Sequence, residues 1–575
     1  MKRFFALAAL LLALSLLAGC SDRLSLDKIG AFLTGKSQEE QPEEAETPPV
    51  EETPPEEMAS ETVLTEVEAP DVLRLAYQPD YGLNPYTCES LTNRVIFSLL
   101  YEPLFLVDSQ YQAVPVLAES AQVSEDGLST TITLRSGVTF HSGAPLTAQD
   151  VVYSYTLARD SSYYDGRFSH FSSVTAPDNR TVVITTDTKY EAVTLLLDFP
   201  IVRDTSADQA AAPENGETGG ESAPSDTTQA DANQADTAQT DPKAPLDGTG
   251  PFRYLESGAL ERFDQWWGGE DWRLGYDQVE LVVCTTATDI RDHFEYSAVN
   301  LVCTDPNAAA YATFHNETDY ELWSSPTTVM QYIGFNLRSD VFSHTAIRAA
   351  ITYAIDRDEV ISQDLGGFAV AASLPAAPSS AYYDAGLAAK FDLDLSAFAA
   401  MLDEAQIQDY TDDGILDVYH EGYAIPVGGT MIVNAGNPQR VATANHIADT
   451  LNGLGFQITV EALDSDDYRE ALRYGNFDLY FGEVRLSPNF DLGLFFREGG
   501  GGSYGGLANS TMLTLCAAML ENSGNAYDLH KRVMEQGYLC PVLFKSYAIY
   551  TTRGAASNLA PAVDWPLGQL TAAES

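Results

Sequence analysis

Three charged side chains lie close together in the segment FGEVRLSPNFDL, which contains Glu483, Arg485 and Asp491. A carboxylate that is withdrawn from water is stabilised when it faces an ammonium group, and a guanidinium can bind a carboxylate through two hydrogen bonds. The segment can therefore bind a ligand that carries either charge. Alternatively, Glu483 and Arg485 occupy alternate positions of one strand and form a weak surface ion pair. The residue types leave both interpretations open.

The acidic turn DYTDDGILDVY, residues 409–419, has the composition of a calcium-binding loop. An EF-hand loop that begins at Asp409 requires a bidentate glutamate at its twelfth position, which here is His420. The histidines form no HExxH motif and the cysteines form no CxxC pair. We therefore expect no catalytic residue, no metal site and no cofactor, and we do not expect an enzyme. Cys284 and Cys303 are the last residues of two neighbouring strand candidates, where they can form a disulfide or remain free.

The formal net charge is −52, from 83 acidic and 31 basic residues. A nucleic-acid-binding protein needs a basic surface for the phosphate backbone, so this balance argues against a nucleic-acid partner. The length of 575 residues is sufficient for two or more hydrophobic cores, because single cores seldom grow beyond about 250–300 residues.

The N-terminus has the pattern of a secretory signal peptide over residues 1–20. Lys2 and Arg3 precede an apolar run that is too short to span a membrane, and small residues then lead to Cys20. Small residues before a cysteine resemble a bacterial lipobox, which predicts that Cys20 is lipidated and is the only membrane attachment. The alternative is an ordinary signal peptide with an incidental cysteine.

Two segments have the composition of disordered chain. Residues 37–70 contain twelve glutamates and neither lysine nor arginine, so residues 21–70 are interpreted as an extended acidic stalk. Residues 204–247 are rich in Ala, Gln, Thr, Gly and Ser and contain no aromatic residue. We interpret this second segment as a disordered surface insertion, because long surface loops cost little additional closure entropy.

The segment Val123–Asp160 predicts a strand, a turn and a helix. TTITLR, residues 130–135, alternates β-branched and apolar side chains at the period of a strand. Thr147 follows a turn that contains Gly and Pro, and it is expected to cap the next helix. Farther along the chain, Ser343 or Thr345 is expected to cap another helix with an apolar face.

Four blocks of sequence occur in an order that is known from one protein family. LNP (83–85) precedes LYEPL (100–104), which is followed by SEDG with LRSGVTFHSGAPLTAQDVVYS, by GTGPF (248–252) and by residues 332–361. Together they resemble the extracellular solute-binding proteins of family 5, the peptide and nickel type, which deliver ligands to ABC importers. A single block of this kind can arise by chance, but four in order are specific.

The resemblance implies an α/β protein with the two-lobed fold of type II periplasmic-binding proteins. It also implies the extra subdomain of the peptide-binding group and a hinge made by two crossings of the chain. The second lobe contains a strand, helix, strand pattern over residues 429–463. The expected boundaries are lobe I at 71–330, with the subdomain at about 88–190, lobe II at 331–538, and a return to lobe I at 539–575.

The resemblance also suggests where a ligand binds. In peptide-binding relatives an aspartate in a "GW..D….P..fL" segment pairs with the α-ammonium of the peptide. The matching position here falls near Leu486, so either Asp491 or Glu483 takes this role or the ligand has no ammonium group. Arg485, Asn336 and Glu89 complete the candidate ligand contacts.

The function that the resemblance implies is that of a lipid-anchored receptor outside the cytoplasmic membrane, in the periplasm if the cell has an outer membrane. It is expected to be a monomer that captures oligopeptides or dipeptides by lobe closure and passes them to an ABC permease and its ATPase. The alternatives are another solute, such as a nickel chelate, an oligosaccharide or haem, and a ligand sensor without a role in import. The fold does not distinguish these ligands.

Overall fold

The computed structural model describes residues 69–206, 243–269, 273–305, 311, 313–314, 319–556 and 559–571. They belong to one compact unit that extends from Glu66 to Ser575. The expected signal peptide, its Cys20, nearly all of the expected stalk and most of the expected insertion lie outside the described residues. For those segments the sequence-based predictions stay predictions.

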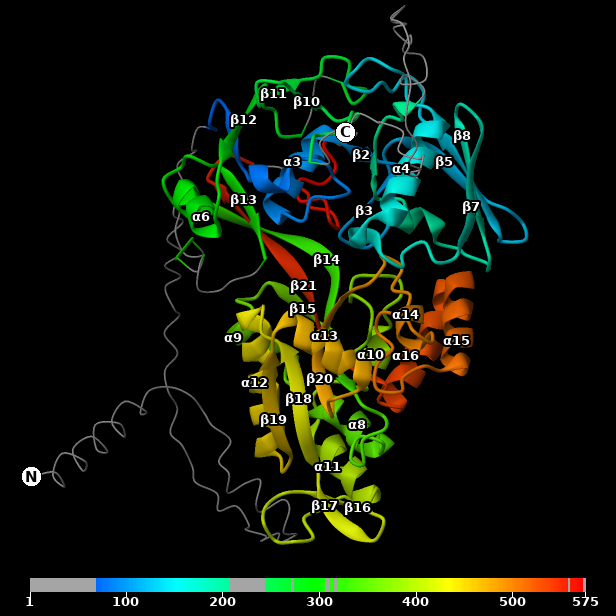
Figure 1. Ribbon diagram of the computed structural model, residues 1–575, viewed down its shortest axis with the longest axis vertical. Coiled ribbons are helices and arrows are strands. Elements are labelled where there is room, and N and C mark those ends of the chain that lie inside the picture. The colour runs from blue at the N-terminus through cyan, green and yellow to red at the C-terminus, as the bar shows by residue number, and fades with distance from the viewer. Residues whose placement is uncertain are drawn as a thin grey trace, which may run out of the picture. The chain divides into compact units, whose positions relative to one another are not determined.

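A mixed sheet of eleven strands extends through both lobes (Figure 1). Its strands follow the order β10-β11-β12-β1-β13-β21-β14-β20-β18-β19, and β15 pairs with β21. The strand bounds are β1 (Leu73–Tyr77), β10 (Phe252–Tyr254), β11 (Leu260–Arg262), β12 (Gln278–Val283), β13 (Leu301–Thr304), β14 (Tyr320–Phe335), β15 (Ala369–Ala371), β18 (Gly428–Asn434), β19 (Gln457–Leu463), β20 (Leu479–Arg485) and β21 (Leu539–Thr552).

Two long antiparallel strands, β14 and β21, cross between the lobes. At one end β21 pairs with β13 of lobe I, and at the other end β14 pairs with β20 of lobe II. The pairing of β14 with β21 shifts register between Pro326 and Met330, so the ladder is interrupted where the lobes meet. The two crossings of the predicted fold are therefore present. The expected boundary after residue 330 falls inside β14, and the one after residue 538 falls at the start of β21.

Lobe II is built on a parallel β18, helix α12 (Pro438–Gly453), β19 unit, as the sequence pattern predicts. The buried face of α12 includes Ala444, Ile447 and Leu451, which pack in a core with β18 and β20. The other elements of this lobe are α8 (Thr345–Ile351), α9 (Arg357–Asp364), α10 (Ala385–Ala388), α11 (Leu395–Glu404), β16 (Asp417–His420), β17 (Tyr423–Pro426), α13 (Ser465–Tyr474), α14 (Gly493–Phe496), α15 (Ser510–Glu521) and α16 (Ala526–Glu535).

An antiparallel sheet, β5-β6-β8-β7, forms the extra subdomain beside the main sheet (Figure 1). The predicted strand and helix are confirmed as β6 (Ser129–Leu134) and α4 (Ala148–Asp160). Thr147 is the N-cap, and its backbone N–H donates to Asp150 Oδ2 at 2.8 Å. The remaining elements are α3 (Leu91–Leu100), β2 (Glu102–Pro103), β3 (Phe105–Val107), β4 (Ala113–Pro115), β5 (Ala118–Val123), β7 (Phe171–Asp178), β8 (Thr181–Thr186), β9 (Pro200–Ile201) and α6 (Ala287–Glu295).

Helix α8 forms as predicted, but its cap differs. The N-cap is His344, whose side chain makes no capping hydrogen bond, so the expectation of Ser343 or Thr345 is wrong. The buried Arg348 side chain instead donates to the backbone carbonyls of Phe342 and Ser343, at 2.7 and 2.9 Å. The approach to this helix is thus held by a long side chain from within it rather than by a short capping residue.

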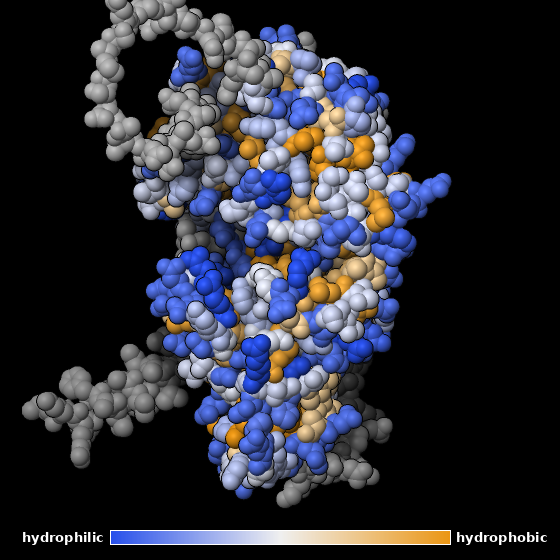
Figure 2. All heavy atoms as spheres, turned by 45° about the vertical axis from the view of Figure 1, so that its right-hand side comes forward, coloured by the Kyte–Doolittle hydropathy of each residue, from blue (hydrophilic) through white to orange (hydrophobic). Residues whose placement is uncertain are grey.

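The five described cysteines are all buried and free, so Cys284 and Cys303 do not form a disulfide. Among the described residues, no helix is both long enough and apolar enough to cross a membrane. On the face shown in Figure 2, hydrophilic residues predominate and hydrophobic residues lie in small groups.

Candidate functional site

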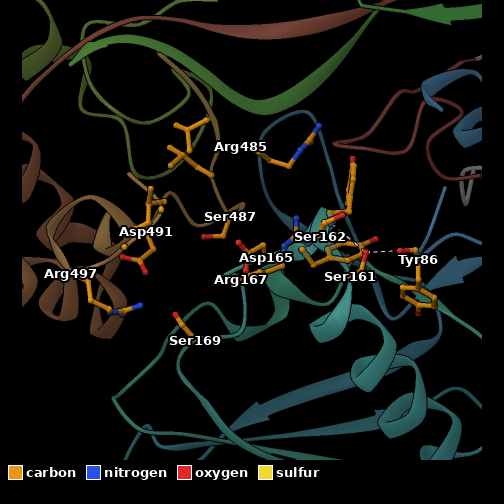
Figure 3. A pocket seen from close by; sticks show the side chains of 18 of the residues that line it. Tyr86, Ser161, Ser162, Asp165, Arg167, Ser169, Arg485, Ser487, Asp491 and Arg497 are labelled. Atoms are coloured by element: carbon orange, nitrogen blue, oxygen red, sulfur yellow. Dashed lines mark hydrogen bonds between the residues drawn. The ribbon is translucent and has the colours of Figure 1, made fainter. Parts of the chain in front are cut away.

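A cavity of about 690 Å³ lies where segments of the two lobes meet. Lobe I lines it with residues 86–89, which precede α3, and with residues in 161–169, which follow α4. Lobe II lines it with the end of β20, with residues up to 487, and with residues between 491 and 501 around α14. Figure 3 shows these polar side chains converging from both sides. A volume of this size is within the range of about 300–1,000 Å³ that is usual for ligand sites.

Asp491 is the carboxylate that lobe II contributes to the cavity. Its side chain is only 14% exposed, its Oδ1 accepts the Gly493 N–H at 2.9 Å, and its Oδ2 lies 3.9 Å from His170 Nε2. Leu486, at the position where relatives are expected to have an aspartate, is buried and donates its backbone N–H to Thr328. Asp491 is therefore the lobe II carboxylate that lines the cavity, and it is largely withdrawn from water.

Arg485 also lines the cavity, but protein groups already occupy its guanidinium. Nη1 lies 2.5 Å from Asp564 Oδ1, Nη2 donates to the Tyr547 hydroxyl at 2.8 Å, and the guanidinium stacks 4.6 Å from the Tyr163 ring centre. Burial would raise the pKa of Asp564, yet Arg485 and two other arginines lower it below its usual value. Arg485 thus connects lobe II to the C-terminal segment of lobe I and has little capacity left for a ligand.

Glu483 does not line the cavity, and it forms no pair with Arg485. It lies 3.3 Å from Lys545 Nζ, which also bonds Asp305 at 2.7 Å, and it accepts the Gln331 amide at 2.9 Å. Burial alone would lower the pKa of Lys545, but the two carboxylates raise it. This cluster connects the crossing strands to β20. The structure gives Glu483 a role in the hinge and no support as a ligand contact.

Of the two remaining predicted contacts, Glu89 lines the cavity and Asn336 does not. The Asn336 amide donates to the carbonyls of Gly475 and Phe477, at 3.2 and 2.9 Å, and it is absent from the cavity lining. Its function in the structure is to hold the loop before β20. Glu89 lines the cavity from lobe I, and its side chain is exposed. Three of the five predicted ligand contacts, Asp491, Arg485 and Glu89, are therefore brought together.

Sequence reasoning missed Arg497, which extends beside Asp491 in Figure 3. In the described part of the chain, its guanidinium has no ion-pair or hydrogen-bond partner. The run of glycines that follows Arg497 in the sequence was a signal for this part of the site, because Gly500 also lines the cavity. A Cβ at Gly500 would lie 2.2 Å from the carbonyl of Leu494, so this backbone requires glycine. Arg167 lines the cavity as well, but it forms a buried ion pair with Asp198.

The subdomain region also contacts lobe II directly. Lys189 Nζ lies 2.6 Å from Glu521 Oε1 at the end of α15. Glu191 accepts the Ser523 N–H at 3.0 Å through its carboxylate, and its own N–H donates to Leu520 at 2.8 Å. These contacts join the subdomain to the end of α15 and to Ser523, which follows it in lobe II.

Two turns with motif-like sequences have structural explanations. The carboxylate of Asp409 accepts the backbone N–H groups of Gly414, Asp413 and Thr411, which lower its pKa and hold the turn together. Ser503 lies in the sequence GGSYG, which matches a nucleophile motif, yet it occupies a turn rather than a strand-to-helix junction. Among the described residues no histidine is hydrogen-bonded to it. Neither turn indicates catalysis.

Comparison with known proteins gives one matching family model. The model of the bacterial extracellular solute-binding proteins, family 5, matches residues 112–502. The oligopeptide-binding protein AppA of Bacillus subtilis is 25% identical over 391 residues, which cover 67% of each chain. The glutathione-binding protein GsiB of Salmonella typhi is 25% identical over 327 residues, and this match covers 52% of the present chain and 55% of GsiB. The chain thus spans about half the length of the glutathione-binding relative.

Solved structures agree in fold. AppA from Bacillus subtilis in complex with a nonapeptide gives a TM-score of 0.55 at 21% identity, covering 85% of this chain and 97% of AppA. NikA from Brucella suis in complex with Fe(III)-EDTA gives a TM-score of 0.62 at 20% identity, and the match covers 87% of this chain and 99% of NikA. The predicted two-lobed type II fold is therefore confirmed. With the family model matched over most of the chain, the protein belongs to the bacterial extracellular solute-binding proteins of family 5.

Proposed function

We propose that this protein captures short peptides in the cavity between its lobes and delivers them to an ABC importer. The observation that carries the proposal is the presence of both charges in one cavity. Asp491 and Glu89 line it beside the unpaired guanidinium of Arg497. A peptide with free ends has an ammonium group for the carboxylates and a carboxylate for the guanidinium. The names of AppA and GsiB, which bind an oligopeptide and glutathione, support this choice.

The proposed mechanism is closure of the two lobes around the ligand. The crossing strands β14 and β21 have an interrupted ladder at the junction, and such a break can absorb the change of backbone angle in a hinge. Arg485 then reaches Asp564 and Lys189 reaches Glu521, so closure adds contacts between lobes that the ligand does not make. Apparent affinity for the ligand therefore depends on the balance between open and closed states.

The proposal includes attachment to the membrane through lipid on Cys20, at the outer face of the cytoplasmic membrane. The partners are an ABC permease and its ATPase, and the receptor acts as a monomer without catalysis or cofactor. Its support is the LAGC sequence at the end of the apolar N-terminal run.

A second candidate ligand is an anionic metal chelate. Arg497 is unpaired among the described side chains, and a structure with a similar fold, NikA, contains Fe(III)-EDTA. Such a ligand would be bound through Arg497 and would have no ammonium group for Asp491. A requirement for a free amino terminus on the ligand distinguishes the two candidates.

Native mass spectrometry of the full chain, before and after mild acid, tests the proposal. We expect additional masses that acid releases and that fragmentation identifies as peptides. A protein that carries only a metal chelate, and that shows no mass shift when incubated with a mixture of dipeptides and tripeptides, would contradict peptide capture. The length distribution of the released peptides would separate dipeptide from oligopeptide binding.

A further inference from the structure

Three side chains that can bind a metal lie together between the end of β12 and helix α6, in lobe I. Cys284 directly follows β12, and Asp289 and His293 lie one turn apart on α6. Each offers one ligand atom, and these atoms all lie within 4.8 Å of one another. In the described part of the chain this is the only such group of three. None of the three lines the ligand cavity.

The fold places these residues together through a strand, helix, strand unit. Strands β12 and β13 both pair with β1 in parallel, and α6 connects them (Figure 1). The carboxyl end of a parallel strand followed by a helix is a common position for a ligand site. Cys284 lies at that end, where its backbone N–H donates to Tyr77 at 2.9 Å. Residues four apart on a helix share a face, so Asp289 and His293 lie on the same face of α6, the one near Cys284.

Local hydrogen bonds orient two of the three side chains. Asp289 Oδ2 accepts the Thr285 N–H at 2.8 Å, and the Asp289 N–H donates to the capping hydroxyl of Thr286 at 3.0 Å. His293 Nδ1 lies 2.8 Å from the backbone carbonyl of Asp289 and 3.1 Å from its Oδ1. A backbone carbonyl that fixes the imidazole is the usual outer contact of a metal-binding histidine.

The ligand types determine the class of metal. A thiolate, an imidazole and a carboxylate together suit a borderline divalent cation such as Zn²⁺, whereas Mg²⁺ and Ca²⁺ prefer oxygen atoms alone. Tetrahedral coordination at about 2.0–2.3 Å brings ligand atoms roughly 3.5 Å apart, so a small contraction of the group is sufficient. Three protein ligands leave one position for water.

Capping of α6 and an ordinary surface ion pair explain part of this arrangement. They account for Thr286, Asp289 and His293, but they do not account for a fully buried thiol within 4.8 Å of both ligand groups. The other buried cysteines, such as Cys303, have no comparable pair of neighbours among the described residues. The thiol is therefore the group that distinguishes this cluster from a capped helix.

We infer that Cys284, Asp289 and His293 form a binding site for Zn²⁺ or a similar divalent cation, separate from the ligand cavity. Binding releases the proton of the thiol to solvent and forms the metal–sulfur bond. The bound ion fastens the first turns of α6 to the end of β12.

The test uses the full chain, treated with a chelator, desalted, and titrated with Co²⁺ as a spectroscopic substitute for Zn²⁺. We expect one equivalent of Co²⁺ to produce the near-ultraviolet thiolate charge-transfer band and the visible bands of tetrahedral cobalt. Cys284→Ser should abolish the thiolate band, and His293→Ala should weaken binding by at least about tenfold. Asp292→Asn, on the same helix but outside the cluster, should leave the titration unchanged.

A thermal-unfolding measurement provides a second readout in case Cys284→Ser does not fold. Zn²⁺ should raise the melting temperature of the original protein and of Asp292→Asn, but not that of His293→Ala, because only a ligand that binds the folded state stabilises it. The inference is overturned if the original protein gives no thiolate band, or if the band persists in Cys284→Ser and thus arises from another cysteine.

Discussion

Replacing Asp491 with asparagine tests the proposed role of this carboxylate most sharply. The amide oxygen can still accept the Gly493 N–H, so the local turn is preserved while the negative charge is lost. The side chain is only 14% exposed, so water screens its charge weakly. A hydrogen bond to a charged group contributes about 1.5–3 kcal/mol, which predicts a loss of affinity of about tenfold to hundredfold.

The assay is isothermal titration calorimetry with a peptide released from the purified protein and with its N-acetylated form. Acetylation removes the ammonium, so the original protein should lose about as much affinity for the acetylated peptide as it loses through Asp491→Asn. The variant itself should distinguish the two peptides far less. The matched control is Glu498→Gln, an exposed neighbour outside the cavity lining, which should bind normally. If the original protein and Asp491→Asn distinguished the free peptide from the acetylated peptide equally well, Asp491 would not be the group that binds the ammonium.

Three further predictions concern charged side chains outside the ligand contact at Asp491. Arg485→Met leaves the buried Asp564 without the guanidinium that it pairs with. Denaturant unfolding should show that the free energy of unfolding falls by about 3–5 kcal/mol, and adding Asp564→Asn should restore part of this loss. A fall of less than about 1 kcal/mol would contradict a stabilising buried pair. Lys189→Gln breaks an ion pair with Glu521 whose side chains are about half exposed, so ligand affinity should change by less than about fivefold in the same calorimetric assay. Burial raises the pKa of Glu102 from 4.5 to about 7, even though two tryptophans and a threonine donate to it. The unfolded chain therefore ionises first, and the stability contributed by this group is complete below pH 4.5 and declines by about 3 kcal/mol as pH rises to 7. The difference in unfolding free energy between the original protein and Glu102→Gln should follow that pH range, and a pH-independent difference would exclude the raised pKa.

Much of the fold follows from short-range patterns in the sequence. The alternation over residues 130–135 and the Thr147 cap predict β6 and α4, because such signals act within a few residues. The cap of α8 was mispredicted because the side chain of Arg348 reaches back to the carbonyls that precede the helix. Which side chain binds the backbone groups at a helix start depends on how that side chain packs in the folded protein, and the local sequence does not determine it.

The site was harder to predict because its charged residues select partners that are distant in sequence. Arg485 pairs with Asp564 and Glu483 pairs with Lys545, whereas the sequence left open whether these two residues bind a ligand or pair with each other. Glu483 and Arg485 point to the same side of β20, because alternate residues of a strand share a face, yet each lies against an opposite charge from a distant part of the chain. Of the two carboxylates that the resemblance suggested, Asp491 lies in the cavity lining and Glu483 does not.

The proposed metal site was also not predictable from the local sequence. Its Cys284, Asp289 and His293 have a spacing that matches no familiar motif, and they converge only because a strand end meets a helix start.

The central claim is that the cavity between the lobes binds the free amino terminus of a peptide. A crystal structure of the full chain with its co-purified ligand tests this claim most directly. We expect peptide density in the cavity, with the terminal ammonium within about 3 Å of the Asp491 carboxylate and the peptide enclosed by both lobes. A ligand that lies elsewhere, or one whose anionic groups contact Arg497 while Asp491 faces only water, would contradict it.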